Sequence, residues 1–203
     1  MSDTGNRARY AHIAPVYDLL DGPFEPLYRP GRLLIGAASV GLTLELGAGT
    51  GKTFPFYGQA ARVVASDLSW SMLARARRRL HPPIQALLVA DAARLPLHGA
   101  SVDTVTAAFV CCVQADPGPA LREIARVLRP GGRALFLECV LPAHGWRRRL
   151  VRLLEPLLHG LYGLHWRRDL PQRLAAAGLP VTEVRPVWGP MVQAIVAAKP
   201  AMN

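Results

Sequence analysis

The sequence has few cysteines and no long apolar run, and these absences exclude several classes of protein. Its three cysteines, Cys111, Cys112 and Cys139, are too few and too unevenly spaced for a disulfide framework, and no cysteines and histidines have the spacing of zinc ligands. No uninterrupted apolar stretch reaches the roughly 18 residues of a membrane-spanning helix. The amino-terminal residues lack the basic and apolar regions of a signal peptide. We therefore expect no metal site and a protein of the reducing cytoplasm, either soluble or peripheral on a membrane.

Acidic residues and lysine are scarce as well. The chain of 203 residues has 24 Lys and Arg against 14 Asp and Glu, for a net charge of +10, and only Lys52 and Lys199 are lysines. A basic balance of this kind fits a nucleic acid, an anionic membrane surface or an acidic ligand, and composition does not choose among them. The length and a hydrophobic content of 51% predict a single globular domain with a full core.

The most informative stretch is Leu-Thr-Leu-Glu-Leu-Gly-Ala-Gly-Thr-Gly-Lys-Thr at residues 42–53. Its first five residues are mostly leucine, which predicts a buried parallel strand. Gly47, Gly49 and Gly51 follow at once. Because glycine has no Cβ, a tight turn there can bring a ligand against bare main chain. The stretch therefore predicts a strand that leads into a ligand-binding turn.

Two common nucleotide-binding loops do not fit this turn. A P-loop requires glycine where Leu46 stands, and the dinucleotide fingerprint requires a third glycine or alanine where Lys52 stands. What remains is Glu-x-Gly-x-Gly-x-Gly from Glu45, with Asp67 closing the next apolar run 20 residues after Gly47. An acidic side chain at that place can accept both hydroxyl protons of a ribose. A turn that binds nothing would explain Gly47 alone, but not this combination.

Strand-like and helix-like stretches alternate along the rest of the chain. Strands are predicted at 42–46, 62–66, 84–90, 102–111, 133–140, 181–187 and 191–198. Helices are predicted at 10–20, at 25–38 with an interruption at Pro30-Gly31, at 70–80, 117–128 and 169–177, with a short one ending near Gly58 and a frayed segment at 1–9. This alternation predicts βαβ units and a doubly wound α/β fold with a mostly parallel sheet. Ligands of such sheets bind beyond the carboxyl ends of the strands, where 45–51, Asp67, Asp91 and 109–112 all fall.

Further blocks complete a resemblance to a known family. They are Val-Val-Ala-Ser-Asp-Leu-Ser-Trp-Ser-Met-Leu at 63–73, Ala-Asp-Ala at 90–92, Leu-Pro-Leu at 95–97 with Ser-Val-Asp at 101–103, and Arg-Val-Leu-Arg-Pro-Gly-Gly at 126–132. Together with the glycine turn, they resemble the class I S-adenosylmethionine-dependent methyltransferases over about residues 10–198. The resemblance implies a Rossmann-like sheet of seven strands with an antiparallel final strand, an amino-terminal helical lid, and S-adenosylmethionine as cofactor.

By the same resemblance, the chain is one methyltransferase domain. Residues 1–40 would form the lid helices, 41–140 the cofactor-binding core, and 141–203 the substrate-side helices and closing strands. Tyr10-x-x-x-Ala14-x-x-Tyr17-Asp18 is similar to an amino-terminal motif of the quinone-biosynthesis C-methyltransferases, phospholipid N-methyltransferases and alkyl thiol methyltransferases. Phe-Pro-Phe-Tyr at 54–57 and Phe-Val-Cys-Cys-Val at 109–113 resemble the last of these groups.

The resemblance also implies roles for residues around the turn. The loop positions under the methionine part of the cofactor would be Gly47, Ala48, Gly49 and Gly51. Glu45 would be oriented toward the amino group of the cofactor, and Asp67 would take the ribose hydroxyls. Asp91, beside Ala92, would take the adenine amino group. The apolar residues implied for the adenine and methionine surfaces, for which ordinary core packing is an equal alternative, are Leu68, Met72 and Phe109.

Two residues are candidates for catalysis. Tyr17 would close over the sulfonium, whose charge an aromatic face can stabilise by about 0.5 to 2 kcal/mol. Glu138, at the end of the predicted fifth strand, would contact a cationic or protic acceptor. Because the methyl group is already activated, positioning is the protein's main task and is worth roughly 7 to 11 kcal/mol, so that an amine or a thiolate needs no base. The other candidates near the strand ends, which we interpret as structural, are His12, Asp18, Cys111, Cys112 and His144.

The segment 145–168 bears on the acceptor. It intersperses leucine and tryptophan with arginine, which suits the headgroup boundary of an anionic membrane, although its leucines could equally fill the core. The first hypothesis is methyl transfer to a small lipophilic acceptor, with a phospholipid headgroup amine, as in phosphatidylethanolamine, as first choice. A thiol sulfur and a quinone ring are the alternatives.

Two other classes of function stay open. A nucleic-acid methyltransferase would fit the charge, but Gln114-Ala115-Asp116 stand where Asn/Asp-Pro-Pro-Tyr would be expected, so we expect no nucleic-acid partner. A non-catalytic protein that binds a membrane surface would keep the fold without the chemistry. The sequence leaves the oligomeric state open, and it predicts a cytoplasmic protein with peripheral attachment to the inner membrane face as an alternative.

Overall fold

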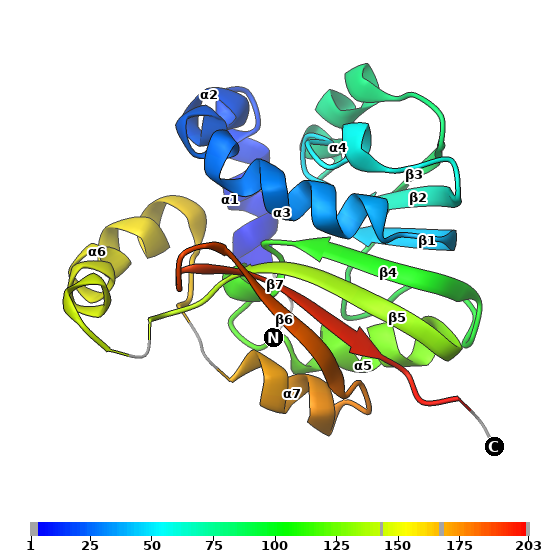
Figure 1. Ribbon diagram of the computed structural model, residues 1–203. Helices are drawn as coiled ribbons and strands as arrows, with labels where there is room; N and C mark the ends of the chain where they lie inside the picture. Colours follow the sequence, from blue (N-terminus) through cyan, green and yellow to red (C-terminus); the bar gives the residue numbers. More distant parts are fainter. Residues whose placement is uncertain (1–3, 143, 167–168, 202–203) are drawn as a thin grey trace.

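The computed structural model describes residues 4–142, 144–166 and 169–201, and its centre is one sheet of seven strands (Figure 1). In chain order the strands are β1 (Gly41–Leu46), β2 (Ala61–Asp67), β3 (Ile84–Val89), β4 (Val102–Ala108), β5 (Leu128–Cys139), β6 (Val181–Trp188) and β7 (Val192–Ala198). Their spatial order is β3-β2-β1-β4-β5-β7-β6. The pairs among β1 to β5 are parallel, and β7 is antiparallel to both β5 and β6. The predicted doubly wound, mostly parallel α/β fold with an antiparallel final strand is confirmed.

Helices cover both faces of this sheet, so its central strands are buried. On one face lie α5 (Gly118–Val127) and α7 (Leu170–Ala176). Leu121, Ile124 and Val127 recur at helical spacing along α5 and are fully buried against the strands. On the other face lie α3 (Glu25–Ala37) and α4 (Trp70–Ala76), whose Ile35 and Leu73 enter the core. The carboxyl ends of β1, β2 and β4 therefore form one open edge between two covered faces.

The lid consists of α1 (Thr4–Ile13), α2 (Tyr17–Asp21) and the 3-10 turn η1 (Gly22–Phe24), which leads directly into α3. The single helix predicted at 10–20 is wrong, because the chain leaves helical geometry around Pro15, which cannot donate the hydrogen bond that would continue it. The frayed segment predicted at 1–9 is also wrong for residues 4–9, which form the first turns of α1. Residues 1–3 lie outside the described residues.

Helix α3 runs without a break through Pro30, where the sequence predicted an interruption. Proline removes one backbone donor, but α3 packs against β5, β6 and β7 along its length. A Cβ on Gly31 would overlap the Leu137 side chain of β5, so glycine allows the helix to lie directly on the sheet. The dipeptide Pro30-Gly31 is therefore a site of close packing and not the end of a helix.

Several element boundaries differ from those predicted. The helix predicted at 70–80 ends as α4 at Ala76 and continues as the 3-10 turn η3 (Arg77–Arg79). Strand β4 ends at Ala108, because Phe109 takes a positive φ of 60° and the chain then forms the 3-10 turn η4 (Cys111–Val113). The short helix predicted to end near Gly58 is the 3-10 turn η2 (Phe54–Phe56). These differences shorten elements but leave the order of the fold unchanged.

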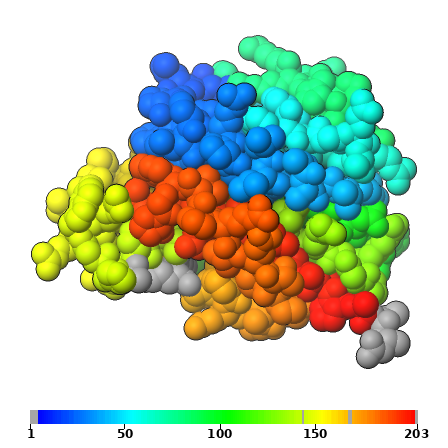
Figure 2. Space-filling view, viewed as in Figure 1, coloured from blue at the N-terminus to red at the C-terminus, as the bar shows by residue number. Residues whose placement is uncertain are grey.

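The segment rich in arginine and leucine forms α6 (Trp146–Tyr162), which ends where Gly163 takes the left-handed conformation with φ of 72°. Figure 1 places α6 beside the lid and away from the sheet, and Figure 2 shows it as a lobe that stands out from the molecule. In the part of the chain that the structure describes, no helix is long and apolar enough to cross a membrane. Residues 167 and 168, at the end of the predicted segment, lie outside the described residues.

Candidate active site

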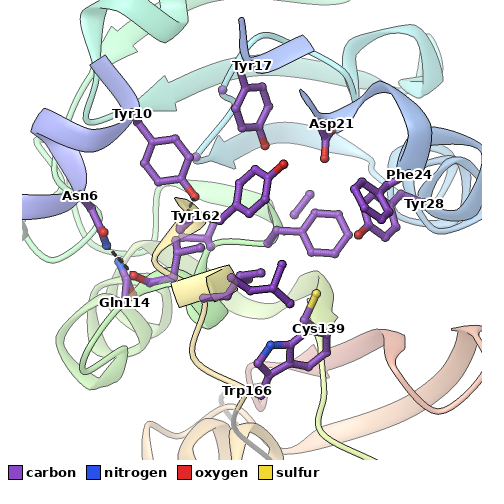
Figure 3. Close-up of a pocket in the computed structure, with 18 of the residues that line it drawn as sticks. Asn6, Tyr10, Tyr17, Asp21, Phe24, Tyr28, Gln114, Cys139, Tyr162 and Trp166 are labelled. Carbon is purple, nitrogen blue, oxygen red and sulfur yellow. Dashed lines mark hydrogen bonds between the residues drawn. The ribbon is translucent and has the colours of Figure 1, made fainter. Parts of the chain in front are cut away.

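A cavity of about 680 Å³ opens at the carboxyl ends of the central strands. Its first arm is lined by the glycine turn after β1 and by the residues that follow β2 and β3. Its second arm lies between the lid, α6 and the turn that joins β6 to β7. Figure 3 shows the side chains of the lid and of α6 around this second arm. The cavity is at the edge of the sheet where parallel α/β folds bind ligands.

The glycine turn and Asp67 form one unit in the first arm. Gly49 N donates a hydrogen bond to Asp67 Oδ2 over 2.9 Å, and Ser69 N donates to Asp67 Oδ1 over 2.8 Å. Gly47 and Gly49 have φ of 61° and 57°, and a Cβ on Gly47 would lie 2.5 Å from Val110 Cγ2. Burial raises the pKa of Asp67, although the backbone N–H groups around it act in the opposite direction. The turn therefore exposes main chain beside a carboxylate that the backbone holds in place.

Asp91 extends this surface from the end of β3. Its Oδ1 accepts a hydrogen bond from Ala93 N over 2.8 Å, which fixes the carboxylate at the start of a turn. Ala92, Leu68 and Met72 line the cavity beside it, and Met72 Cε lies 3.5 Å from where a Cβ of Gly49 would be. The predicted cofactor residues that line the cavity are Gly47, Gly49, Asp67, Leu68, Met72, Asp91, Ala92 and Phe109.

Three of the predicted cofactor residues lie behind the turn and not in the cavity lining. Side chains alternate along β1, so Glu45 points toward the face covered by α3 while Leu46 reaches the cavity. Ala48 packs in the core with Leu73, and a Cβ on Gly51 would lie 2.8 Å from the Phe54 ring. Glu45, predicted to be oriented toward the amino group of the cofactor, directly or through water, is thus not among the residues that line the cavity.

Glu45 is nevertheless an unusual residue, because its carboxyl group is 2% exposed. Burial raises its pKa from 4.5 to about 7, although the hydroxyls of Tyr57 and Thr53 and the charge of Arg32 lower it.

Glu138 also differs from its prediction as an acceptor-binding residue. It is 1% exposed, and it accepts hydrogen bonds at Oε1 from Val110 N and Cys111 N, over 3.0 and 2.8 Å, and at Oε2 from Cys112 N over 3.0 Å. Burial raises its pKa, and these N–H groups oppose the rise. Because both oxygens are engaged and the residue does not line the cavity, Glu138 has a structural role: it holds the turn that begins at the positive φ of Phe109.

Tyr17, which was predicted to close over the sulfonium, lies in the cavity lining together with residues to which the sequence analysis assigned no role. These are Tyr10 and Asp21 of the lid, Phe24 at the end of η1, Tyr28 in the first turn of α3, and Tyr162 at the end of α6. Tyr10 belongs to the amino-terminal motif, and that motif was the signal in the sequence that could have identified this residue. Tyr10 Oη donates to the carbonyl oxygen of Tyr162 over 3.0 Å, so the lid contacts α6 across the second arm.

Acidic residues of the lid bind basic residues of the core. Asp18 accepts hydrogen bonds from Thr50 and from Arg79, over 2.7 and 2.8 Å. Partial burial would raise the pKa of Asp18, but these two bonds hold it below its ordinary value. Asp21 Oδ2 lies 2.5 Å from Lys52 Nζ. Since Thr50 and Lys52 belong to the glycine turn, the lid is attached to the turn itself.

The wall of the second arm is apolar. The side chains that α6 and the following segment contribute to it include Trp146, Leu150, Val151, Leu154, Leu158, Leu164 and Trp166. Trp188 and Met191 add to it from the turn between β6 and β7. The thiols of Cys111 and Cys112, below this wall, are buried, and their pKa values are raised well above the ordinary range, with Glu138 contributing, so neither is an activated nucleophile.

Comparison with known proteins places this geometry in a family. A methyltransferase domain model matches residues 44–136. The ubiquinone/menaquinone biosynthesis C-methyltransferase UbiE of Syntrophotalea carbinolica is 35% identical over 176 residues, which are 82% of this chain and 70% of that protein. The chain belongs to the class I S-adenosylmethionine-dependent methyltransferases. Its cofactor is S-adenosylmethionine, and the predicted fold, family and enzyme class are confirmed.

Other proteins similar to this methyltransferase are named for other substrates. The phosphatidylethanolamine N-methyltransferase of Cereibacter sphaeroides is 37% identical over 102 residues, which are 48% of this chain and 50% of that protein. The human thiol S-methyltransferase TMT1B is 35% identical over 133 residues, 61% of this chain and 53% of that protein. The chain thus spans about half the length of each. Among solved structures, a chain in the complex between the Haloferax volcanii Trm112 methyltransferase activator and a methyltransferase has a TM-score of 0.77 at 20% identity, covering 97% of this chain and 98% of that one.

Proposed function

We propose that this methyltransferase acts on a lipophilic acceptor, and that a phospholipid headgroup amine, as in phosphatidylethanolamine, is the first candidate. The observation that carries the proposal is the continuity of the cavity, which runs from the glycine turn and Asp67 to an apolar wall on α6. A small polar acceptor would not fill such a wall, whereas an alkyl or acyl chain would remove it from water. The name of the Cereibacter sphaeroides relative supports the choice of a headgroup amine.

The residues of the first arm fit the cofactor. Bare main chain at Gly47 and Gly49 would lie under its methionine part, and the carboxylates of Asp67 and Asp91 would accept hydrogen bonds from the adenosine. When bound, S-adenosylmethionine supplies a methyl group that is already activated. The lid roofs the cavity with Tyr17, so the protein's part is to exclude water and to hold the acceptor in line. With both oxygens of Glu138 bound to backbone, we propose an acceptor that needs no base.

The outer side of α6 supports docking on an anionic membrane surface. Leu153 and Leu157 are 77% and 67% exposed, and the exposed arginines Arg149 and Arg152 lie beside them on the same helix. Apolar side chains beside arginine fit the boundary between headgroups and acyl chains. Since the inner side of the same helix lines the second arm, a docked helix would place that arm at the bilayer. We therefore propose peripheral attachment to the cytoplasmic face of the inner membrane.

Two other acceptors stay as second candidates. A thiol sulfur is supported by the human thiol S-methyltransferase relative, and a quinone ring by the UbiE relative. Alkyl thiols and quinols are both lipophilic, so either would fit the apolar wall of the cavity. Labelled methyl transfer to a panel of phospholipids, alkyl thiols and quinols would rank them. Faster turnover of a small water-soluble acceptor than of any member of the panel would contradict the lipophilic acceptor.

A further inference from the structure

Four tyrosines from different elements meet in the second arm of the cavity. They are Tyr10 of α1, Tyr17 of α2, Tyr28 of α3 and Tyr162 of α6, which we call the tyrosine cage. The rings of Tyr10 and Tyr17 lie 6.1 Å apart at 60°, and those of Tyr28 and Phe109 lie 4.6 Å apart at 51°. Tyr28 is also stacked on Phe24, with ring centres 6.2 Å apart, so the tyrosines belong to a continuous aromatic lining between the lid and α6.

The carboxylate of Asp21 lines the same cavity as the tyrosine cage. It is 8% exposed and lines the cavity, and Figure 3 shows its oxygens directed into the space beside Tyr17 and Tyr28. Burial is the main cause that raises the pKa of Tyr17, and the charge of Asp21 comes next. Burial is also the main cause that raises the pKa of Tyr10, Tyr28 and Tyr162, and the charge of Asp21 adds to it, so all four phenols stay uncharged.

Uncharged aromatic rings around a carboxylate form an environment for a cation. The face of each ring is electronegative, and its attraction for a positive charge grows when water is excluded. Asp21 Oδ2 accepts a hydrogen bond from Lys52 Nζ over 2.5 Å, and the same ammonium group lies 5.7 Å from the centre of the Tyr17 ring, so this part of the cage already holds one cation of the protein.

The charge balance of methyl transfer then separates the candidate acceptors. An alkyl amine is an ammonium at neutral pH, so it first releases a proton to water. The neutral amine then attacks with its lone pair, a C–N bond forms, the C–S bond breaks with its electron pair going to sulfur, and the positive charge moves from sulfur to nitrogen. When a thiolate or a deprotonated quinol attacks, the positive charge is cancelled and two neutral products result. An environment that stabilises a cation favours the amine reaction, because a positive charge is present from reactants to products. It disfavours the reaction of a thiolate or a deprotonated quinol, because the positive charge is lost there.

We propose that the tyrosine cage and Asp21 select an acceptor with a nitrogen that becomes cationic, so that the substrate of this enzyme is an amine and not a thiol or a quinol. This inference rests on the proposed function, because it assigns the second arm to the acceptor. It adds to that function the residues that choose the acceptor's class, namely Asp21 together with the rings of Tyr17 and Tyr28.

The test compares two probes that differ in one atom. Dodecylphosphocholine has a quaternary nitrogen, and its isostere has a quaternary carbon at the same place. Calorimetry with protein saturated with S-adenosylhomocysteine, and with both probes kept below micelle formation, gives their dissociation constants. The cationic probe should bind on the order of tenfold more tightly than the isostere. Tyr28→Leu should bring this ratio close to one, while Tyr28→Phe should retain it, because phenylalanine keeps the ring face.

The possible outcomes distinguish the cation-selecting cage from the lipophilic acceptor. Equal affinities for the two probes, or a preference for the isostere, would refute the cage and leave the lipophilic acceptor in place. An unchanged ratio in Tyr28→Leu would also refute it, provided that thermal unfolding shows the variant to be folded. Binding of S-adenosylhomocysteine without binding of either probe would refute the lipophilic acceptor as well. If the cage served only the sulfonium, Tyr28→Leu would change the affinity for S-adenosylmethionine alone, and the two probes would bind equally.

Discussion

Replacing Glu45 with glutamine should stabilise the protein at neutral and higher pH. Glu45 is 2% exposed, and burial raises its pKa from the ordinary 4.5 to about 7. Since each pKa unit corresponds to about 1.4 kcal/mol, a shift of this size means that ionising the buried carboxyl group costs about 3 kcal/mol. Glutamine has nearly the same shape and carries no charge at any pH, so it does not bear this cost.

The sign of the pH dependence follows from the raised pKa. Below about pH 4.5 the carboxyl group is protonated in both the folded and the unfolded chain, and the variant gains nothing. As the pH rises from there to about 7, the unfolded chain releases the proton while the folded chain retains it, so the wild type loses stability. Above pH 7 the full difference of about 3 kcal/mol in favour of Glu45→Gln should be present.

Urea unfolding of both proteins without cofactor, at about pH 4 and about pH 8, measures this difference. Glu123→Gln is a matched control with the opposite sign, because the hydrogen bond from Arg126 lowers the pKa of Glu123 and its carboxylate supports the folded state above that pKa. A Glu45→Gln variant with the same advantage at both pH values, or with none, would refute the reasoning. It would mean that a partner compensates the ionised Glu45 inside the protein.

The remaining predictions concern Asp67, Glu138 and the outer side of α6. Asp67→Ala should weaken binding of S-adenosylmethionine by about 1.5 to 3 kcal/mol, measured by calorimetry, and unchanged affinity would move the ribose site elsewhere. Glu138→Ala leaves the N–H groups of Val110, Cys111 and Cys112 without a hydrogen-bond acceptor, so urea unfolding should show a loss of about 3 kcal/mol or more in the free energy of unfolding. A variant that is equally stable but has a raised KM for the methyl acceptor would instead support the predicted contact between Glu138 and the substrate. The double variant Leu153→Glu, Leu157→Glu should reduce sedimentation with anionic vesicles by on the order of tenfold. The control Val184→Glu, at a position 45% exposed on β6, should leave sedimentation unchanged. Equal sedimentation of both variants would contradict docking through α6.

The sequence was informative where a function depends on neighbouring strands. Gly49 and Asp67 meet because β1 and β2 pair in parallel, and the lengths of the elements between them are readable from the chain. The alternation of side chains along β1 also contained a signal that Glu45 and Leu46 face different sides, so that only one of them could reach the cavity. The role of Glu138 was not readable in this way, because its partners come from a turn that β4 enters only through the positive φ of Phe109.

The acceptor side was harder to predict because it depends on contacts between distant segments. Tyr28 and Tyr162 are single residues of two helices that line the same cavity only in the folded chain, and neither stands in a recognisable pattern. The segment 145–168 predicted both membrane contact and core packing, and α6 separates the two sets of side chains: Val151 is buried and Leu153 is 77% exposed. Two interpretations that competed at the level of the sequence therefore apply to opposite sides of one helix.

Lys52 bears on both the glycine turn and the position of the lid. It is the residue at which the dinucleotide fingerprint fails, and in the structure its ammonium group lies 2.5 Å from Asp21 and 3.6 Å from Glu25 and is 11% exposed. Buried ion pairs contribute little net stability, but a lone carboxylate at such a place is costly, so the pairs specify where the lid lies. A small residue in place of Lys52 would leave Asp21 of the lid and Glu25 of α3 without this partner. The chain thus uses charge at the turn to fix the helices whose tyrosines face the cavity, and Asp21 belongs to both arrangements.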